Sequence, residues 1–245
     1  MRRFGKTMKS KWGVATLAFA VGLVILSGCQ KDDNGIYQVS AVRALNAVPG
    51  SEQLDLGLDE SWLNYDLQTG EVERFAYRDT LPYKQAWPGV RSVRVFEGGN
   101  ITNNGLLAKG SVQFVAGKFY SLYVVGHGGD VELMLTEDDL SEPKAGKAKI
   151  RFINLSPDAP TLDFGIDGAE AFIADDMAFK EVKSFSAVDG GETYTFNIIE
   201  HSNGDVVHSF EFRPESGRIY TVWVRGLFEN GKNAKLGLGH DIIVH

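Results

Sequence analysis

The sequence has 245 residues, of which 43% are apolar, with 25 Lys and Arg, 32 Asp and Glu, and one cysteine. This length can bury one or two hydrophobic cores, and a single cysteine excludes a fold held together by intrachain disulfides. The net charge of −7 gives no electrostatic support for nucleic-acid binding, because phosphates repel an acidic surface.

The first 28 residues are typical of a secretory signal peptide. A cationic start with five Lys and Arg precedes an apolar run over residues 12–26. That run is shorter than the ~20 residues of a membrane-spanning helix, so the pattern favours a cleaved signal over a retained anchor. Cleavage would leave 20 Lys and Arg against 32 acidic residues, a net charge of −12.

The residues around Cys29 predict where the protein resides. Leu26-Ser27-Gly28-Cys29 resembles the lipobox of bacterial lipoproteins, which implies cleavage before Cys29 and attachment of fatty acyl chains there. Several such chains, palmitate among them, anchor a protein to a membrane durably. The alternative is a chance cysteine behind an ordinary signal peptide.

The next four residues, Gln30, Lys31, Asp32 and Asp33, resemble the export signal of Bacteroidota-type lipoproteins. That resemblance implies a lipid anchor in the outer membrane with the chain facing the cell exterior. The alternative is a solvated tether on a protein of the periplasmic leaflet.

An internal repeat predicts two domains. The segments 42–49 and 54–59 recur 108 residues later, at 150–157 and 162–167, whereas 117–126 recurs 100 residues later, at 217–226. The shift corresponds to eight extra residues in the first copy, at 62–69. Copies of about a hundred residues are of ordinary domain size. We therefore expect a lipidated tether over 29–38, a domain over 39–140, a linker over 141–147 and a second domain over 148–245.

Both copies have the pattern of short β-strands. Alternating segments rich in β-branched and aromatic residues are separated by Gly-Gly and Asn-Gly turns, and no long helix is indicated. In chain order, the expected strands are Val42–Leu45, Leu54–Leu58, Ser92–Phe96, Tyr120–Val125, Lys149–Ile153, Thr161–Ile166, Thr193–Ile199, Val206–Phe212 and Tyr220–Val224. The predicted fold class is all-β, with two tandem antiparallel β-sandwich domains.

The turn Ser156-Pro157-Asp158-Ala159-Pro160, followed by a strand that ends at Asp167-Gly168, resembles the domain-of-unknown-function family DUF4397. The first copy departs from this signature, with Val48-Pro49-Gly50-Ser51 in place of the turn, so its membership rests on the repeat. The resemblance implies immunoglobulin-like or transthyretin-like sandwiches on secreted and lipid-anchored bacterial proteins, without an established activity.

Three carboxylates near this turn, Asp158, Asp163 and Asp167, raise the question of a calcium site. Asp163 and Asp167 would share a strand face but lie about 13 Å apart along it, too far for one ion. The alternative, which we favour, is that Asp158 orders its own turn and that the other two are solvated or cap turns. The five histidines lack the spacing of a zinc site. The expectation is therefore no metal and no cofactor.

The sequence contains no nucleophile elbow, zinc-protease motif or Walker loop, and it predicts no catalytic residue. Trp62, Tyr65 and Trp87 fall on expected loops, where aromatic rings can stack on sugars or anchor a partner. For Trp62 the alternative, which we favour, is a side chain folded back to cover the sandwich or to fill the joint between the domains. The expected function is a non-enzymatic binding or adhesion module for glycan or protein. The alternatives are a structural or accessory subunit of an envelope complex and, third, a glycan-acting hydrolase.

Overall fold

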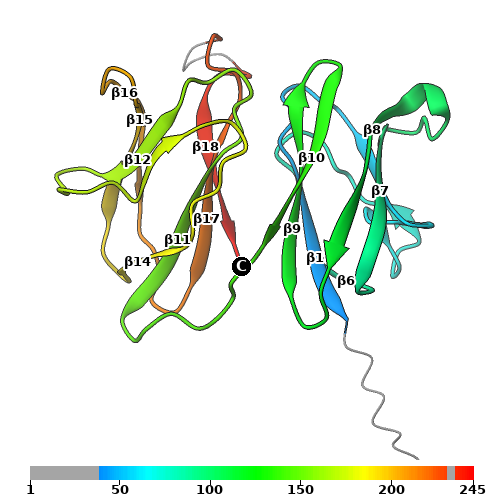
Figure 1. The fold of residues 1–245 in the computed structure, drawn as a ribbon, viewed down its shortest axis with the longest axis horizontal. Helices are drawn as coiled ribbons and strands as arrows, with labels where there is room; N and C mark the ends of the chain where they lie inside the picture. The colour runs from blue at the N-terminus through cyan, green and yellow to red at the C-terminus, as the bar shows by residue number, and fades with distance from the viewer. Residues whose placement is uncertain (1–38, 231–234) are drawn as a thin grey trace, which may run out of the picture. The chain divides into compact units, whose positions relative to one another are not determined.

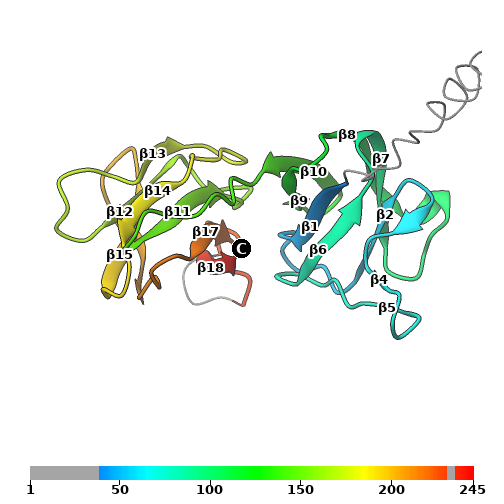
Figure 2. The same ribbon diagram turned by 90° about the horizontal axis from the view of Figure 1, so that it is seen from below.

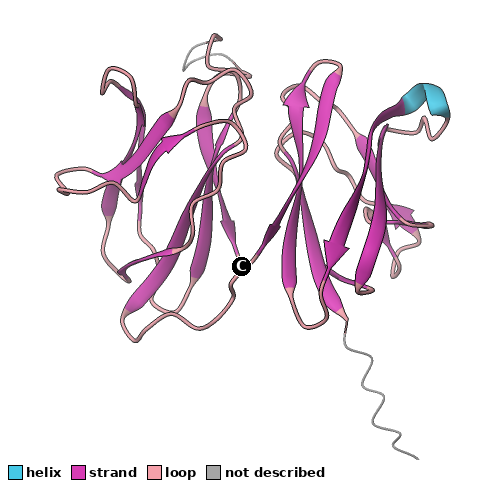
Figure 3. Ribbon diagram, in the orientation of Figure 1, coloured by secondary structure: helices cyan, strands magenta, loops and turns pink. Residues whose placement is uncertain are grey.

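The computed structural model describes residues 39–230 and 235–245, which fall within one compact unit, Gln38–His245. The expected signal peptide, Cys29 and the export signal Gln30–Asp33 lie outside the described residues. The described chain consists of strands and loops with one short 3₁₀ helix, η2 (Asn103–Gly105) (Figure 3). None of its helices has the length and apolar character needed to cross a membrane.

The first half is a sandwich of two four-stranded sheets with a separate hairpin. Its strands are β1 (Ser40–Asn46), β2 (Leu54–Leu58), β3 (Ser61–Trp62), β4 (Tyr65–Asp66), β5 (Glu71–Val72), β6 (Thr80–Ala86), β7 (Gly89–Glu97), β8 (Leu106–Phe114), β9 (Phe119–His127) and β10 (Asp130–Glu137). One sheet has the order β10-β9-β1-β6 and the other β3-β2-β7-β8 (Figure 1). The hairpin pairs β4 with β5 and stands beside these sheets (Figure 2).

The second half is also a sandwich of two four-stranded sheets. Its strands are β11 (Lys147–Asn154), β12 (Leu162–Ile166), β13 (Ala174–Met177), β14 (Ser186–Asp189), β15 (Tyr194–Glu200), β16 (Val206–Phe212), β17 (Ile219–Arg225) and β18 (Gly239–Val244). The sheet orders are β14-β11-β17-β18 and β13-β12-β15-β16. The all-β sandwich architecture expected from the sequence is confirmed.

The two halves share one strand order. The sheet β10-β9-β1-β6 corresponds to β18-β17-β11-β14, and β3-β2-β7-β8 corresponds to β13-β12-β15-β16. Each half contains one parallel pair in an otherwise antiparallel set: Val42 of β1 lies opposite Tyr120 of β9, and Ile150 of β11 lies opposite Tyr220 of β17. Val42 and Ile150 are 108 residues apart and Tyr120 and Tyr220 are 100 apart, the two spacings of the sequence repeat. The repeated segments thus occupy equivalent positions in the two sandwiches.

Each sandwich has its own hydrophobic core between its sheets. In the second core Phe152, Phe164 and Phe196 form a continuous stack, with ring centroids 4.7 and 5.3 Å apart along it. The first core is built on aliphatic residues such as Leu56 and Leu122, with Phe75 and Phe114. Burying one such side chain contributes roughly 1.5–3 kcal/mol, so these cores supply the stability that disulfides do not.

A third apolar cluster joins the two halves, and we call it the joint. Its buried members are Leu45, Ala47, Tyr123, Val125, Ile153, Leu155, Trp223 and Ile243. They come from the outer faces of the sheets that contain the parallel pairs. The joint explains why β9 and β17 are buried along nearly their whole length: Leu122 and Val222 face the cores, whereas Tyr123 and Trp223 face the joint. Equivalent faces of the two copies therefore pack on each other.

Candidate functional site

The aromatic residues predicted to bind a ligand do not form one surface. Trp62 is half-buried, packs edge-on against Phe96 with ring centroids 5.7 Å apart, and lies over Gly57. Trp62 therefore covers the sheet. Tyr65 is half-buried in β4 and its carbonyl oxygen accepts a hydrogen bond from Lys84 Nζ at 3.0 Å.

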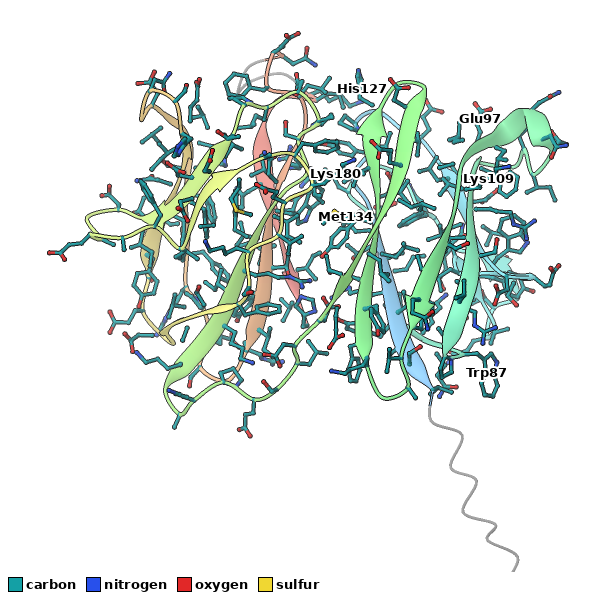
Figure 4. The ribbon with its side chains drawn as sticks, viewed as in Figure 1. Trp87, Glu97, Lys109, His127, Met134 and Lys180 are labelled. Carbon is teal, nitrogen blue, oxygen red and sulfur yellow. The ribbon has the colours of Figure 1, made fainter. Side chains whose placement is uncertain are left out.

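Trp87 lies at a different place, in the turn between β6 and β7, and is 57% exposed (Figure 4). Gly57 pairs with Arg94, which is five residues along β7 from Gly89. Five strand residues span about 17 Å, so Trp62 and Trp87 are too far apart for a common stacking platform.

The turn Ser156–Pro160 binds a distant part of the chain. Asp158 accepts hydrogen bonds from the backbone N–H groups of Phe228 at 2.7 Å and Glu229 at 3.1 Å. Ser156 is buried and its hydroxyl donates to the Gly226 carbonyl oxygen at 2.7 Å. Within its own turn Asp158 is contacted by Ser156 Oγ at 3.3 Å, but, contrary to our expectation, the backbone amides that it binds are not those of its turn. Because β11 and β17 are parallel neighbours, the loops that follow them meet at one sheet edge, which brings Asp158 to these amides.

The neighbouring aspartates also have separate partners. Asp163 is buried and accepts the Asp176 N–H at 2.7 Å, and its other contact is with His201 Nδ1 at 2.9 Å. This hydrogen bond raises the pKa of His201. Asp167 accepts from Asn197 at 3.2 Å. Asp163 is thus buried and paired rather than solvated. Across the described residues no group of three or more His, Cys, Asp or Glu is arranged to hold a metal ion.

The densest polar network lies at the joint. Arg151 is 2% exposed and forms an ion pair with Asp138, and its other donors reach Thr221 Oγ1 at 2.8 Å and the Tyr123 hydroxyl at 3.1 Å. His245 extends the network through Thr221 Oγ1 at 2.7 Å.

The network also includes Tyr83, whose hydroxyl donates to Asp138 at 2.7 Å and lies 2.8 Å from His245 Nδ1. Burial lowers the pKa of His245 to about 4 and, with the charge of Asp138, raises that of Tyr83. A hydroxyl, an imidazole and a carboxylate thus lie together, as in a hydrolase, but Thr221 and the His245 side chain are fully buried. Substrate has no access to them, and the network holds the joint together.

A groove opens at one end of the joint, and we call it the joint groove. Its walls come from the β9–β10 turn, the Ser156–Pro160 turn and the loop after β17; the lining includes His127, Asp130, Pro157, Phe179 and Glu229. Lys180, beside Phe179, forms an ion pair with Glu132 at 2.7 Å that crosses the joint (Figure 4).

The rim of the joint groove carries polar side chains that have no hydrogen-bond or ion-pair partner in the described part of the chain. Within residues 39–230 and 235–245, the side chains of His127, Asp130 and Glu229 make no hydrogen bond or ion pair, and all three are exposed. Phe179 adds a half-buried aromatic ring. The groove therefore offers hydrogen-bonding groups and an apolar surface to an extended polar ligand. Sequence reasoning missed it because its walls meet only through the packing of the two sandwiches at the joint and the non-local pairing of β11 with β17.

Comparisons with solved structures found β-sandwich proteins at low similarity. One is a family 26 carbohydrate-binding module of Amy13K from Eubacterium rectale, solved with maltoheptaose. It is 11% identical to this chain, the alignment covers 84% of this chain and 96% of the module, and the TM-score is 0.25. Family 41 carbohydrate-binding modules from streptococcal virulence factors have 13% identity, coverages of 76% and 93%, and a TM-score of 0.25. TM-scores this low carry no argument about function.

A search of curated proteins found no match. A family model does match: the domain of unknown function DUF4397, at residues 40–165. The match covers the first half, which departs from the SPDAP signature, and continues through the Ser156–Pro160 turn into β12. Since the match spans more than half of the 245 residues, the chain belongs to the DUF4397 family.

Proposed function

We propose that this protein is a lipid-anchored, non-catalytic binding module that holds a glycan chain in the joint groove at the cell surface. In this proposal residues 1–28 are a signal peptide, Cys29 carries the lipid, and Gln30–Asp33 direct the protein to the outer face of the outer membrane. The domains extend over 39–140 and 148–245, and the second is a further copy of the DUF4397 domain, as its equivalent strand order supports.

The observation that carries the binding proposal is the set of three rim side chains, those of His127, Asp130 and Glu229, that have no partner among residues 39–230 and 235–245. Asp130 and Glu229 offer carboxylate oxygens as acceptors for sugar hydroxyls, and His127 offers ring nitrogens. Phe179, which packs against the joint and has Lys180 Nζ 5.3 Å from its ring centroid, adds apolar surface to the groove lining. Sites of this kind combine an apolar surface with a few convergent polar groups. The acidic charge of the rim favours a neutral ligand over an anionic one.

A non-catalytic role is supported by where the reactive groups lie. The hydroxyl–imidazole pair of Thr221 and His245 is buried in the joint and does not line the groove. The Asp158 carboxylate accepts hydrogen bonds from two backbone N–H groups, so its role in this proposal is to hold the groove wall in place.

A glycan array probed with the processed chain tests the proposal. We expect binding to at least one neutral glycan that is lost in the double variant Asp130→Ala/Glu229→Ala. The matched control is Glu170→Ala/Asp205→Ala, which removes the same charge from exposed turns of the sheet β13-β12-β15-β16 and leaves binding intact. Both pairs are exposed, so neither variant is expected to unfold the protein.

Two outcomes would contradict the proposal. Absence of any bound glycan, with photo-crosslinking from position 127 in cells capturing one dominant envelope protein, would favour the accessory-subunit alternative. Hydrolysis of a glycan in the array would favour the hydrolase alternative.

A further inference from the structure

Four large apolar side chains are exposed at one end of the first sandwich, and we call them the end patch. Trp87 and Val90 are 57% and 68% exposed, and Val115 and Phe119 are 51% and 40% exposed. Trp87 and Val115 lie in the β6–β7 and β8–β9 turns, and Val90 and Phe119 lie at the adjoining starts of β7 and β9. Monomeric soluble proteins rarely gather apolar side chains in this way without a binding role.

Strand registers place both turns at the same end. Val90 lies on β7 opposite Gln113, next to the end of β8, and Phe119 lies opposite Ala41 at the start of β1. Ser40 lies opposite Ala86, the residue before Trp87. The end patch is therefore located where the chain enters the sandwich. Figure 4 labels Trp87 at this end.

A backbone hydrogen bond ties this end of the sandwich to the chain that precedes it. The Gly117 N–H donates to the Val39 carbonyl oxygen at 2.9 Å. Val39 is the first described residue and follows the segment that leads back to Cys29. The tether thus joins the sandwich beside the end patch.

The second sandwich shows that the fold does not require this patch. The β8–β9 turn and the β16–β17 turn are equivalent, since the Tyr120 hydroxyl accepts the Val115 N–H at 3.1 Å and the Tyr220 hydroxyl accepts the Glu215 N–H at 3.0 Å. An exposed Glu215 thus replaces Val115. At the position of Phe119, the second copy has Ile219, which is 7% exposed.

The β6–β7 turn is likewise more apolar than its equivalent in the second copy. Between β14 and β15 the second copy has Gly190-Gly191-Glu192-Thr193, where the first copy has Trp87-Pro88 between β6 and β7. Among the described residues this apolar end occurs in the first copy, although both copies have the same strand order.

The tether identifies the surface that this end can meet. Nine residues separate Cys29 from Val39, so a fully extended tether spans at most about 35 Å. A chain anchored at Cys29 holds the end patch this close to the bilayer, which raises the effective concentration of a weak contact. Tryptophan favours the membrane–water interface, and Trp and Phe are typical of the apolar face of segments that lie on a membrane. Neither turn itself contains an acidic residue; Glu137 and Asp139 lie beside Phe119, and Glu137 forms an ion pair with Lys118 at 2.7 Å.

We propose that the end patch rests on the lipid bilayer, with Trp87 and Phe119 among the headgroups. This inference rests on the lipid anchoring in the proposed function. The contact would fix the orientation of the first sandwich on the membrane and keep it from swinging freely on its tether.

Tryptophan quenching in vesicles tests the inference. The full chain is expressed in a bacterium, purified from membranes and reconstituted into phosphatidylcholine vesicles with or without bromine atoms on the acyl chains. Of the three tryptophans after Cys29, Trp223 is buried at the joint and Trp62 covers its own sheet. We expect brominated lipid to quench the Trp87 share of the emission, and Trp87→Phe to abolish that loss.

Two further variants separate docking from other effects. Val90→Ser/Val115→Ser keeps the Trp87 probe and weakens the patch, so quenching should fall. Phe172→Ser removes a side chain of the second sandwich that is 52% exposed, and quenching should not change.

Flotation of the same vesicles distinguishes failure of the docking inference from failure of the lipid anchor. Protein that floats with the vesicles but shows equal emission in both lipids overturns the docking inference and leaves the anchor intact. Protein that does not float overturns the anchor, and the docking inference with it.

Discussion

Arg151→Ala tests whether the joint is held by a buried ion pair. The guanidinium of Arg151 contacts the Asp138 carboxylate, Thr221 Oγ1 and the Tyr123 hydroxyl, and lies 4.7 Å from the Phe185 ring centroid. Removing it leaves Asp138 buried and without a counter-charge. Breaking a buried pair by removing one partner costs about 3–5 kcal/mol, and we expect the free energy of unfolding to fall by that amount.

The repeat provides a matched control. Arg43 is the equivalent residue of the first copy, but it is only half-buried, with one hydrogen bond to the Val244 carbonyl oxygen at 3.0 Å and a contact with the Tyr83 ring. Arg43→Ala should cost about 1 kcal/mol, the usual net value of one hydrogen bond. Urea unfolding followed by tryptophan fluorescence suits both variants, because Trp223 lies in the joint.

A double-mutant cycle with Asp138→Asn completes the test. Because the two side chains share one ion pair, the double variant should lose less stability than the sum of the single variants, by about 0.5–3 kcal/mol. The reasoning is refuted if Arg151→Ala costs no more than Arg43→Ala, or if the cycle is additive within experimental error.

Three further predictions concern pH, packing and backbone conformation. Burial lowers the pKa of His245 from 6.5 to about 4, so between these pH values the unfolded chain binds a proton that the folded chain does not. The free energy of unfolding should therefore drop by up to about 3 kcal/mol as the pH falls from 6.5 to 4. Urea titrations across this range should show a smaller drop for His245→Gln, and an unchanged drop would contradict the assignment. Phe164→Ala, in the middle of the aromatic stack, should cost about 3–5 kcal/mol, and a loss in calorimetry below 1 kcal/mol would mean that the stack repacks. Gly226→Ala should lower the free energy of unfolding more than Gly217→Ala in the same assay. Both glycines have φ +82°, but a Cβ at 226 would lie 2.2 Å from the Gly237 carbonyl oxygen, whereas a Cβ at 217 would meet nothing within 4 Å. Equal losses would contradict this reasoning.

Sequence pattern alone determined the strands that alternate regularly and the repeat that relates them. The segments predicted at 54–58, 206–212 and 120–125 coincide with or lie inside β2, β16 and β9. The edge strand β16 was thus predicted, but two other edge strands, β6 and β8, escaped this reasoning. β6 contains Pro82, which argues against a strand because it lacks a backbone N–H, and β8 interrupts its apolar residues with Lys109, Gly110 and Ser111. Their pairing with neighbouring strands, rather than their own composition, holds them in the sheets.

The functional surfaces depended on tertiary structure. The sequence pointed to the Ser156–Pro160 turn, but only the parallel pairing of β11 with β17 brings Asp158 to the amides of Phe228 and Glu229. Likewise, Arg43 and Arg151 stand at equivalent places in the repeat, and only the packing of the two sandwiches buries one of them fully. Local sequence fixes which residues alternate and where turns form, because those are properties of neighbouring residues. Contacts between segments a hundred residues apart depend on how the sheets pair and pack, so the joint and its groove emerge only in the folded chain.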